Sequence, residues 1–216
     1  MAADKRYMED SLSTPLSEVL RIIQSRLLAD STYFGIKCLR SPIDFWIYQE
    51  IVHSLKPDVI VEIGNFRGGS ALSLAHLCDH LSKGQVIGVD INHSQLDPAA
   101  VAHPRISFIT GDGSDVFDQV AERCHAAETV LVIEDSSHEY QKTFDILTKY
   151  SQLVTVGSYL IVEDSICHHG LPIGPKPGPY EAIAAFVASN PRFVSDRGRE
   201  PFLITWNPTG YLRRLS

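Results

Sequence analysis

The chain has 216 residues, of which 44% are hydrophobic and 21% are charged, and its formal net charge is −7. This length suits one domain of ordinary size, and the composition is that of a globular protein rather than a disordered one. Because arginine and lysine residues are scattered along an acidic chain, we expect no nucleic acid among its partners.

The sequence carries no pattern typical of secretion or of membrane insertion. The N-terminus has charges of both signs, and no apolar run approaches the roughly 18 residues that span a bilayer. The cysteines form no CxxC pair and so indicate neither a disulfide framework nor a structural zinc site; they are Cys38, Cys78, Cys124 and Cys167. We expect a cytoplasmic protein with reduced thiols and no membrane partner.

The first predicted element is an amphipathic helix. Apolar residues recur at helical spacing from Leu16 to Leu28. Ser13 or Thr14 is suited to cap this helix, and Pro15 is suited to its first turn. We expect the helix to lie outside the main sheet.

A second helix is predicted from Pro42 to Ser54, with Ser41 as its N-cap. The segment between the two helices, STYFGIKCLRS, predicts a loop. We therefore divide the chain into an N-terminal helical extension or lid, residues 1–40, and one catalytic domain, residues 41–216.

From Pro57 onward, short runs rich in valine, isoleucine and leucine alternate with helical stretches. The predicted strands are DVIVEIG, QVIGVDI, ISFITGD, TVLVIED and SYLIVED. Nearly continuous apolar strands joined by helices are typical of a buried parallel sheet with right-handed crossovers. The fold class is therefore α/β, with a doubly wound, Rossmann-like sheet.

The C-terminal part adds a helix near Tyr180 to Ser189 and two strand-like pieces, RFVSD and PFLITWN. These two pieces lie close enough in sequence to predict an antiparallel hairpin at the edge of the sheet. The closing YLRR is expected to be a solvated tail.

The first strand leads into a glycine-rich turn and then a helix, the arrangement that brings a ligand close to backbone N–H groups. The turn reads ExGxxxGGS and therefore differs from the GxGxxG fingerprint of dinucleotide sites. An acidic residue before the first glycine suits the cationic amino-acid end of S-adenosylmethionine. The candidate cofactor contacts here are Glu62, Gly64, Asn65, Phe66, Gly68 and Ser70. A turn whose glycines serve only its geometry remains the alternative.

The next two strands also end in acidic residues. Asp90 ends the second strand, where a carboxylate can accept hydrogen bonds from ribose hydroxyls. Asp112 and Gly113 follow the third strand and are candidates to meet the adenine amino group. Asp112 as a simple turn residue is the alternative.

Two Glu-Asp pairs, Glu134-Asp135 and Glu163-Asp164, follow two further buried strands. Several carboxylates in one crevice repel one another, and a hard cation with oxygen ligands offsets that cost. We expect a magnesium-type site held by Asp135, Glu163 and Asp164, with Asp135 also near the cofactor. In the alternative, some of these acids pair with Arg67 or cap helices.

His138 follows in EDSSHEY, on a loop expected to overhang the same crevice. An imidazole can take the proton of a hydroxyl whose acidity a metal has raised, so His138 is the candidate general base. A plain surface histidine is the alternative, and His168 and His169 are weaker candidates for the same role.

With these residues in view, the chain resembles the cephalosporin hydroxylase family, which includes the protein needed for C-7 methoxylation of cephalosporins and bacterial rhamnosyl O-methyltransferases. The resemblance covers roughly residues 30 to 214 and rests on YFGIKCLRSPIDFWIYQEIV, KPDVIVEIGNFRGGSAL, GQVIGVDI, HPRISFITGD, EDSSH, GSYLIVEDS, GPKPGP and FLITWNPTGYLRR. It implies a class I methyltransferase fold, S-adenosylmethionine at the EIGNFRGGS turn, and magnesium on Asp135, Glu163 and Asp164. The sequence shows no two-His-one-carboxylate iron site, so methyl transfer is the expected reaction.

The resulting hypothesis is a magnesium-dependent O-methyltransferase in which His138 removes a proton and the acceptor oxygen attacks the sulfonium methyl group. The acceptor is expected to be a small molecule with a hydroxyl group: a secondary metabolite, a sugar or a catechol-like aromatic. Tyr33, Phe34 and Trp46 are candidates to cover it, and the aromatic N-terminal segment suits a homo-oligomer face. Two rivals remain: a nicotinamide-dependent oxidoreductase and a non-catalytic binding protein.

Overall fold

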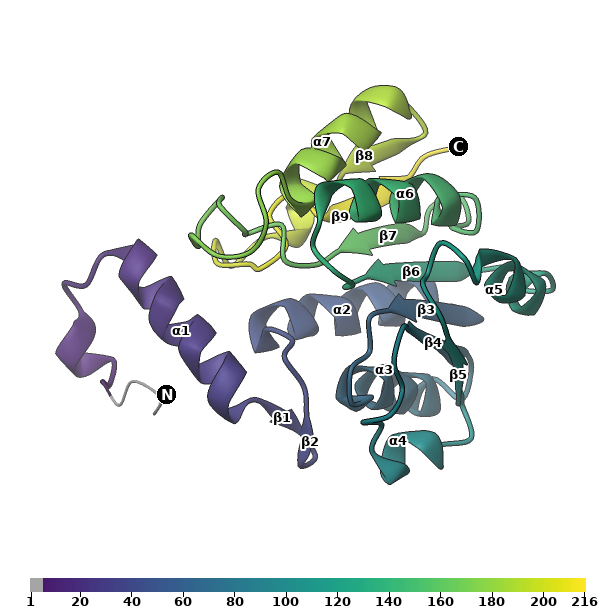
Figure 1. The fold of residues 1–216 in the computed structure, drawn as a ribbon, viewed down its shortest axis with the longest axis horizontal. Coiled ribbons are helices and arrows are strands. Elements are labelled where there is room, and N and C mark those ends of the chain that lie inside the picture. Colours follow the sequence, from purple (N-terminus) through teal and green to yellow (C-terminus); the bar gives the residue numbers. More distant parts are fainter. Residues whose placement is uncertain (1–5) are drawn as a thin grey trace.

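The computed structural model describes residues 6–216 and is built around one seven-stranded sheet (Figure 1). Across the sheet the strands are β5 (Ile106–Thr110), β4 (Gln85–Asp90), β3 (Val59–Ile63), β6 (Val130–Glu134), β7 (Tyr159–Val162), β9 (Tyr211–Arg214) and β8 (Phe193–Ser195). The strands from β5 to β7 run parallel, whereas β9 is antiparallel to both of its neighbours. The predicted α/β sheet is therefore confirmed.

Helices cover both faces of this sheet. One face carries α2 (Pro42–Leu55) and α3 (Gly69–His80), and the other carries α5 (Phe117–Cys124), α6 (Tyr140–Tyr150) and α7 (Pro179–Ser189); three short helices are η1 (Glu9–Ser11), α4 (Pro98–Val101) and η2 (Arg197–Arg199). In β3, Val61 joins the core under α6 and α7, while its neighbour Ile60 joins the core under α2 and α3. Because successive side chains of β3 alternate between two faces that are both covered by helices, every residue of the strand is buried.

The predicted first helix is confirmed as α1 (Leu16–Asp30). The predicted cap is wrong, because Pro15 occupies the N-cap position and no side chain caps the helix there, so neither Ser13 nor Thr14 serves. Proline has a fixed φ that suits a helix start, which accounts for its place at this boundary.

The second helix, α2, begins at Pro42 as predicted, and the Asp44 N–H donates to the Ser41 Oγ at 3.4 Å. The segment before it is more than a loop. It contains a short antiparallel hairpin of β1 (Thr32–Tyr33) and β2 (Ile36–Lys37).

The C-terminal antiparallel hairpin is present, but its second strand differs from the predicted one. It is β9, Tyr211–Arg214, which inserts between β7 and β8, so YLRR is a sheet strand and not a solvated tail. Both Tyr211 and Leu212 are fully buried. The segment 201–207, predicted as the strand, forms turns instead because its polar groups bond to α2: the Trp206 N–H and the Thr205 hydroxyl donate to Asp44.

Helix α1 lies outside the sheet, on the side to which the carboxyl ends of β6 and β7 point (Figure 1). Leu20 and Leu27 of α1 pack with Ile166, Leu171 and Trp206. This contact sets α1 beside the strand ends that carry the candidate site. Among the described helices, none combines the length and the apolar character needed to cross a membrane.

Candidate active site

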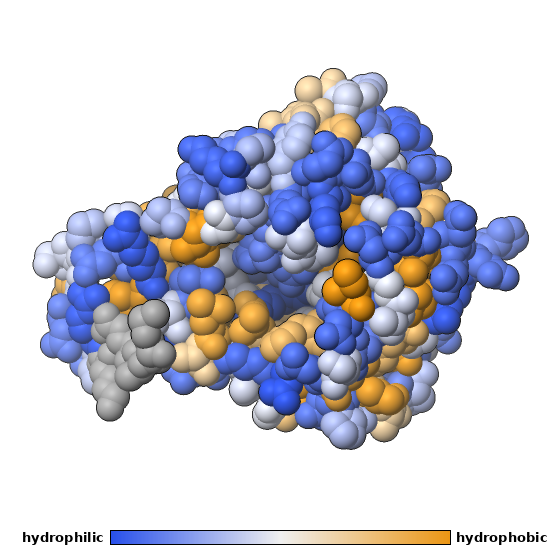
Figure 2. Space-filling model, viewed as in Figure 1, coloured by the Kyte–Doolittle hydropathy of each residue, from blue (hydrophilic) through white to orange (hydrophobic). Residues whose placement is uncertain are grey.

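A cavity of about 510 Å³ opens at the carboxyl ends of the parallel strands. Figure 2 shows a hollow in this part of the molecule, between α1 and the sheet, with hydrophilic and hydrophobic residues around its rim. The predicted site residues that line the cavity are Gly64, Asn65, Phe66, Ser70, Asp90, Asp112, Gly113, Asp135, His138, Glu163 and Asp164. Two predicted residues, Glu62 and Gly68, are not part of its lining.

Gly64 lies in the turn directly after β3 and lines the cavity. Its φ is +87°, and a Cβ atom built there would lie 1.9 Å from the carbonyl oxygen of Asp135. A glycine is therefore required, both for the backbone conformation and for the close approach of the loop after β6. The turn brings the loop after β3, where the cofactor is expected, directly against the segment that carries Asp135 and His138.

Asp90 orders the loop that follows Gly64. Its Oδ2 accepts the backbone N–H groups of Asn65 and Phe66 at 3.0 and 2.9 Å, and its Oδ1 accepts the N–H of Asn92. Asn65 is held further by His93, whose Nε2 lies 2.9 Å from the Asn65 Oδ1. The carboxylate thus fixes the loop at the cavity edge where a ribose is expected.

Asp112 combines the two roles that the sequence left open. Its Oδ1 accepts the backbone N–H of Ser114 at 2.9 Å, as a turn residue does, and it also lines the cavity. Lys142 Nζ lies 3.7 Å from its Oδ2. Next to it, Gly113 is packed so closely that an added Cβ atom would lie 2.8 Å from Ile146 Cδ1.

Gly68 and Glu62 support the loop from behind. Gly68 is the N-cap of α3, where an added Cβ atom would lie 2.7 Å from the Ala100 Cβ. Glu62 is fully buried, and its Oε1 accepts a hydrogen bond from the Nη2 of Arg40 at 2.8 Å. Burial raises the pKa of Glu62, against the lowering effect of Arg40. The charge of Glu62 is therefore matched within the protein.

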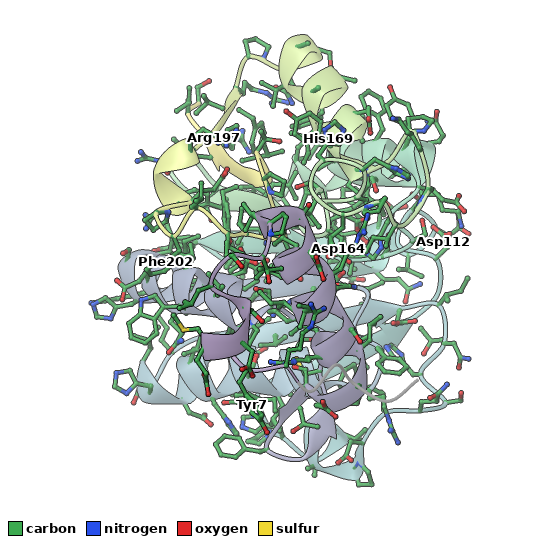
Figure 3. All side chains as sticks on the ribbon, turned by 90° about the vertical axis from the view of Figure 1, so that its left-hand side faces the viewer. Tyr7, Asp112, Asp164, His169, Arg197 and Phe202 are labelled. Atoms are coloured by element: carbon green, nitrogen blue, oxygen red, sulfur yellow. The ribbon has the colours of Figure 1, made fainter. Side chains whose placement is uncertain are left out.

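Asp135, His138 and Asp164 form a cluster in which one ligand atom from each residue lies within 4.8 Å of the others. The His138 Nε2 is 3.2 Å from the Asp135 Oδ1 and 3.5 Å from the Asp164 Oδ2. Figure 3, viewed from the side of α1, shows Asp164 near the middle of the molecule. Among the described residues this cluster is the place best suited to hold a cation, with the Asp135 and Asp164 carboxylates as its oxygen donors.

The pKa values of this cluster reflect its burial first and the crowding of like charges second. Burial, together with the charge of Glu163, raises the pKa of Asp135. Burial raises the pKa of Asp164 to about 6, against the lowering effect of His138. Burial lowers the pKa of His138, but the hydrogen bond and charge of Asp135 outweigh it and raise that pKa to about 9. The cluster is thus short of positive charge, which a bound cation would supply.

Three non-glycine residues of the cavity wall have left-handed backbone conformations. The φ angles are 45° for Phe66, 59° for His138 and 56° for Asp164. Such conformations are uncommon outside glycine and collect at functional sites, where the surrounding structure holds them. The Asp164 N–H donates to the Asn207 Oδ1, which is one such restraint.

Glu163 lies at the cavity but is hydrogen-bonded by Arg40, a residue that was not among the predicted site residues. Arg40 donates to the Glu163 Oε1 from both Nε and Nη2, at 2.9 and 2.5 Å. Arg67, which the alternative interpretation paired with some of these acids, is exposed. Arg40 stands just before Ser41, the cap of α2, and no pattern in the sequence indicated that this loop crosses to the strand ends.

Other candidates lie away from the acid cluster. His169 contacts Glu181 at 2.9 Å and His168 contacts the carbonyl oxygen of Gly174 at 3.1 Å, and neither lines the cavity. Figure 3 shows His169 above Asp164.

The predicted acceptor cover also lies elsewhere. Tyr33 and Phe34 pack against His76, and Trp46 is 57% exposed. Trp206 lines the cavity instead, with its Nε1 donating to the Gln24 Oε1 of α1 at 2.6 Å.

Comparisons with known proteins identify the family and the fold. The family model described as Rhamnosyl O-methyltransferase/CmcI matches residues 25–215. A rhamnosyl O-methyltransferase of Mycobacterium leprae is 37% identical over 194 residues, which cover 85% of this chain and 83% of that protein. A CmcI structure with Mg-SAM has a TM-score of 0.69 at 25% identity and covers 86% of this chain and 77% of that one. An O-methyltransferase from Bacillus cereus shares the fold at 20% identity, with a TM-score of 0.54, over 82% of this chain and 80% of its own.

The sheet, the glycine turn and the strand-end cavity are those of a class I methyltransferase, which uses S-adenosylmethionine. Within that class the chain belongs to the Rhamnosyl O-methyltransferase/CmcI family and is an O-methyltransferase. This assignment decides against the nicotinamide-dependent oxidoreductase that the sequence alone left open.

Proposed function

We propose that the chain transfers the methyl group of S-adenosylmethionine to a hydroxyl group of a small molecule and that a divalent cation, such as Mg²⁺, takes part. The observation that carries the proposal is the joining of two half-sites in one cavity. The turn at Gly64 and Asp90 forms one half, and Asp135, His138 and Asp164 form the other.

The cation would be held by Asp135 and Asp164, with Glu163 beside them. Carboxylate oxygens are the donors that hard cations prefer, and the ligand atoms of Asp135 and Asp164 lie within 4.8 Å of one another, close enough to share one ion. When bound, the cation would orient and acidify an acceptor hydroxyl and cancel the carboxylate charge that raises the pKa of His138.

The cofactor half positions the methyl donor. Asn65, Phe66 and Ser70 line the expected place of its amino-acid end, and Asp90, Asp112 and Gly113 line that of its adenosine. S-adenosylmethionine brings an already activated methyl group, so the protein's task is to hold donor and acceptor in line.

His138 is the proposed general base. It reaches the cluster from the loop between β6 and α6, and it is bonded to Asp135, which fixes the ring. In this position His138 can accept the proton of an acceptor hydroxyl placed over the acids. Its role distinguishes the enzyme from a protein that merely binds a ligand, because binding alone requires no base.

For the acceptor we propose a hydroxyl group of a sugar, free or borne by a secondary metabolite, as the first class to test. The support is the similarity to proteins named rhamnosyl O-methyltransferases. A catechol-like ring is the second class, since its adjacent oxygens also suit a cation.

Binding measurements test the proposed site without an identified acceptor. We expect the demethylated cofactor, S-adenosylhomocysteine, and Mg²⁺ to bind the purified protein in calorimetric titrations. Asp135→Asn removes one cation donor and should weaken Mg²⁺ binding by about tenfold or more, whereas the same change at exposed Asp118 should have no effect.

Two results would contradict the proposal. One is a failure of S-adenosylhomocysteine to bind. The other is equal Mg²⁺ affinity in the Asp135→Asn variant and in the Asp118→Asn control.

A further inference from the structure

Arg40 is a buried cation at the base of the cavity. Its side chain is 2% exposed, and its guanidinium carbon lies 4.7 Å from the centre of the Tyr48 ring. Two carboxylates share it: the Glu62 Oε1 at 2.8 Å and the Glu163 Oε1 at 2.5 Å from the same Nη2. One guanidinium therefore joins the ends of β3 and β7, which have β6 between them.

The two carboxylates differ in what they can reach. Glu62 is enclosed, and its Oε2 has no hydrogen-bond partner among the described residues. Glu163 lines the cavity, next in sequence to Asp164 of the acid cluster. Both hydrogen bonds that Arg40 makes to Glu163 end on one oxygen, Oε1, and Oε2 is not involved in either.

A carboxylate at this depth needs a positive partner, because burial without one disfavours the charged form. Arg40 is that partner in the structure. A divalent cation at Asp135 and Asp164 would offer Glu163 a second partner. The carboxylate cannot give its full charge to both, so the two interactions compete.

We propose that Arg40 is a positioning residue that competes with the cation for Glu163: it holds the Glu163 carboxylate, and a divalent cation bound at Asp135 and Asp164 would draw that carboxylate away from it. This inference rests on the proposed cation site. It assigns Glu62 the task of retaining Arg40 when Glu163 turns to the cation.

The inference predicts opposite effects for two substitutions around the same guanidinium. Arg40→Met removes the competitor and should tighten Mg²⁺ binding by about tenfold. Glu62→Gln leaves Arg40 with one charged partner, Glu163, and should weaken Mg²⁺ binding by a similar factor. The measurement is calorimetric titration of each purified protein with Mg²⁺ alone, and the rise in melting temperature at saturating Mg²⁺ is a second readout.

The matched control is Arg40→Lys, which keeps the charge but lacks the planar fork that serves two carboxylates at once. Its affinity should fall between those of the unsubstituted protein and Arg40→Met. If Arg40 served stability alone, all three variants would melt earlier and bind Mg²⁺ as the unsubstituted protein does.

The inference is overturned if Arg40→Met binds Mg²⁺ no more tightly than the unsubstituted protein, or if Glu62→Gln binds it as tightly or better. Should Arg40→Met fail to fold, Glu62→Gln decides the matter alone. Failure of the unsubstituted protein to bind Mg²⁺ would contradict the proposed cation site itself, and the inference with it.

Discussion

At the residue scale, Gly64 meets the tightest steric requirement of the site. A Cβ atom there would overlap the Asp135 carbonyl, so Gly64→Ala must displace either the cofactor turn or the loop that carries the acids. We expect a loss of unfolding free energy of about 2 to 4 kcal/mol and much weaker S-adenosylhomocysteine binding. Urea denaturation and calorimetric titration measure these two quantities.

Gly157→Ala is the matched control for that change. Gly157 has nearly the same φ, +86°, but has no atom within 4 Å of an added Cβ. Only the backbone strain remains, so the loss should be about 1 kcal/mol, with no effect on binding. Equal losses in the two variants would show that close packing at Gly64 is unimportant.

Part of the cavity lining was predictable from the sequence, because it lies where apolar strands end. Asp90, Asp135 and Asp164 follow from this rule, since parallel strands place their carboxyl ends at one edge. The rule gave no means of finding Arg40 or Trp206. They reach the cavity from loops outside the parallel strands, and a loop's path depends on tertiary contacts that leave no periodic pattern.

At the element scale, α2 determines the path of the C-terminal segment. The buried Asp44 accepts hydrogen bonds from the Thr205 hydroxyl, the Trp206 N–H and the Tyr211 hydroxyl. The same segment supplies Asn207, which accepts the Asp164 N–H. The apolar pattern of PFLITWN predicted a strand because it could not show that a carboxylate from α2 would capture its polar groups.

Asp44→Asn tests this link. The asparagine amide would replace one accepting oxygen of Asp44 by an NH₂ donor, which cannot accept from the three groups that donate to Asp44. We therefore expect a loss of unfolding free energy of about 2 to 4 kcal/mol. Asp118→Asn, on the exposed side of α5, is the control and should change stability by less than about 0.5 kcal/mol. An Asp44→Asn protein as stable to urea as this control would mean that the network contributes little to the fold.

At the scale of the whole molecule, the N-terminal extension and the sheet meet at the site. Gln24 of α1 contacts Trp206 at the cavity wall, and Arg40 contacts acids from two strands. The division into residues 1–40 and 41–216 and the homo-oligomer remain predictions. Sheet architecture was predictable because it follows from nearly continuous apolar strands joined by helices, whereas the docking of α1 rests on a few contacts distant in sequence.

An assay of methyl transfer itself tests the proposed function. The purified protein would be given S-adenosylmethionine with a labelled methyl group, Mg²⁺ and a panel of rhamnose-bearing and catechol acceptors, alongside a His138→Gln variant. We expect labelled O-methyl product whose formation depends on Mg²⁺ and falls by about 10²-fold or more in the variant. Product formed equally well without Mg²⁺ and without His138 would contradict it.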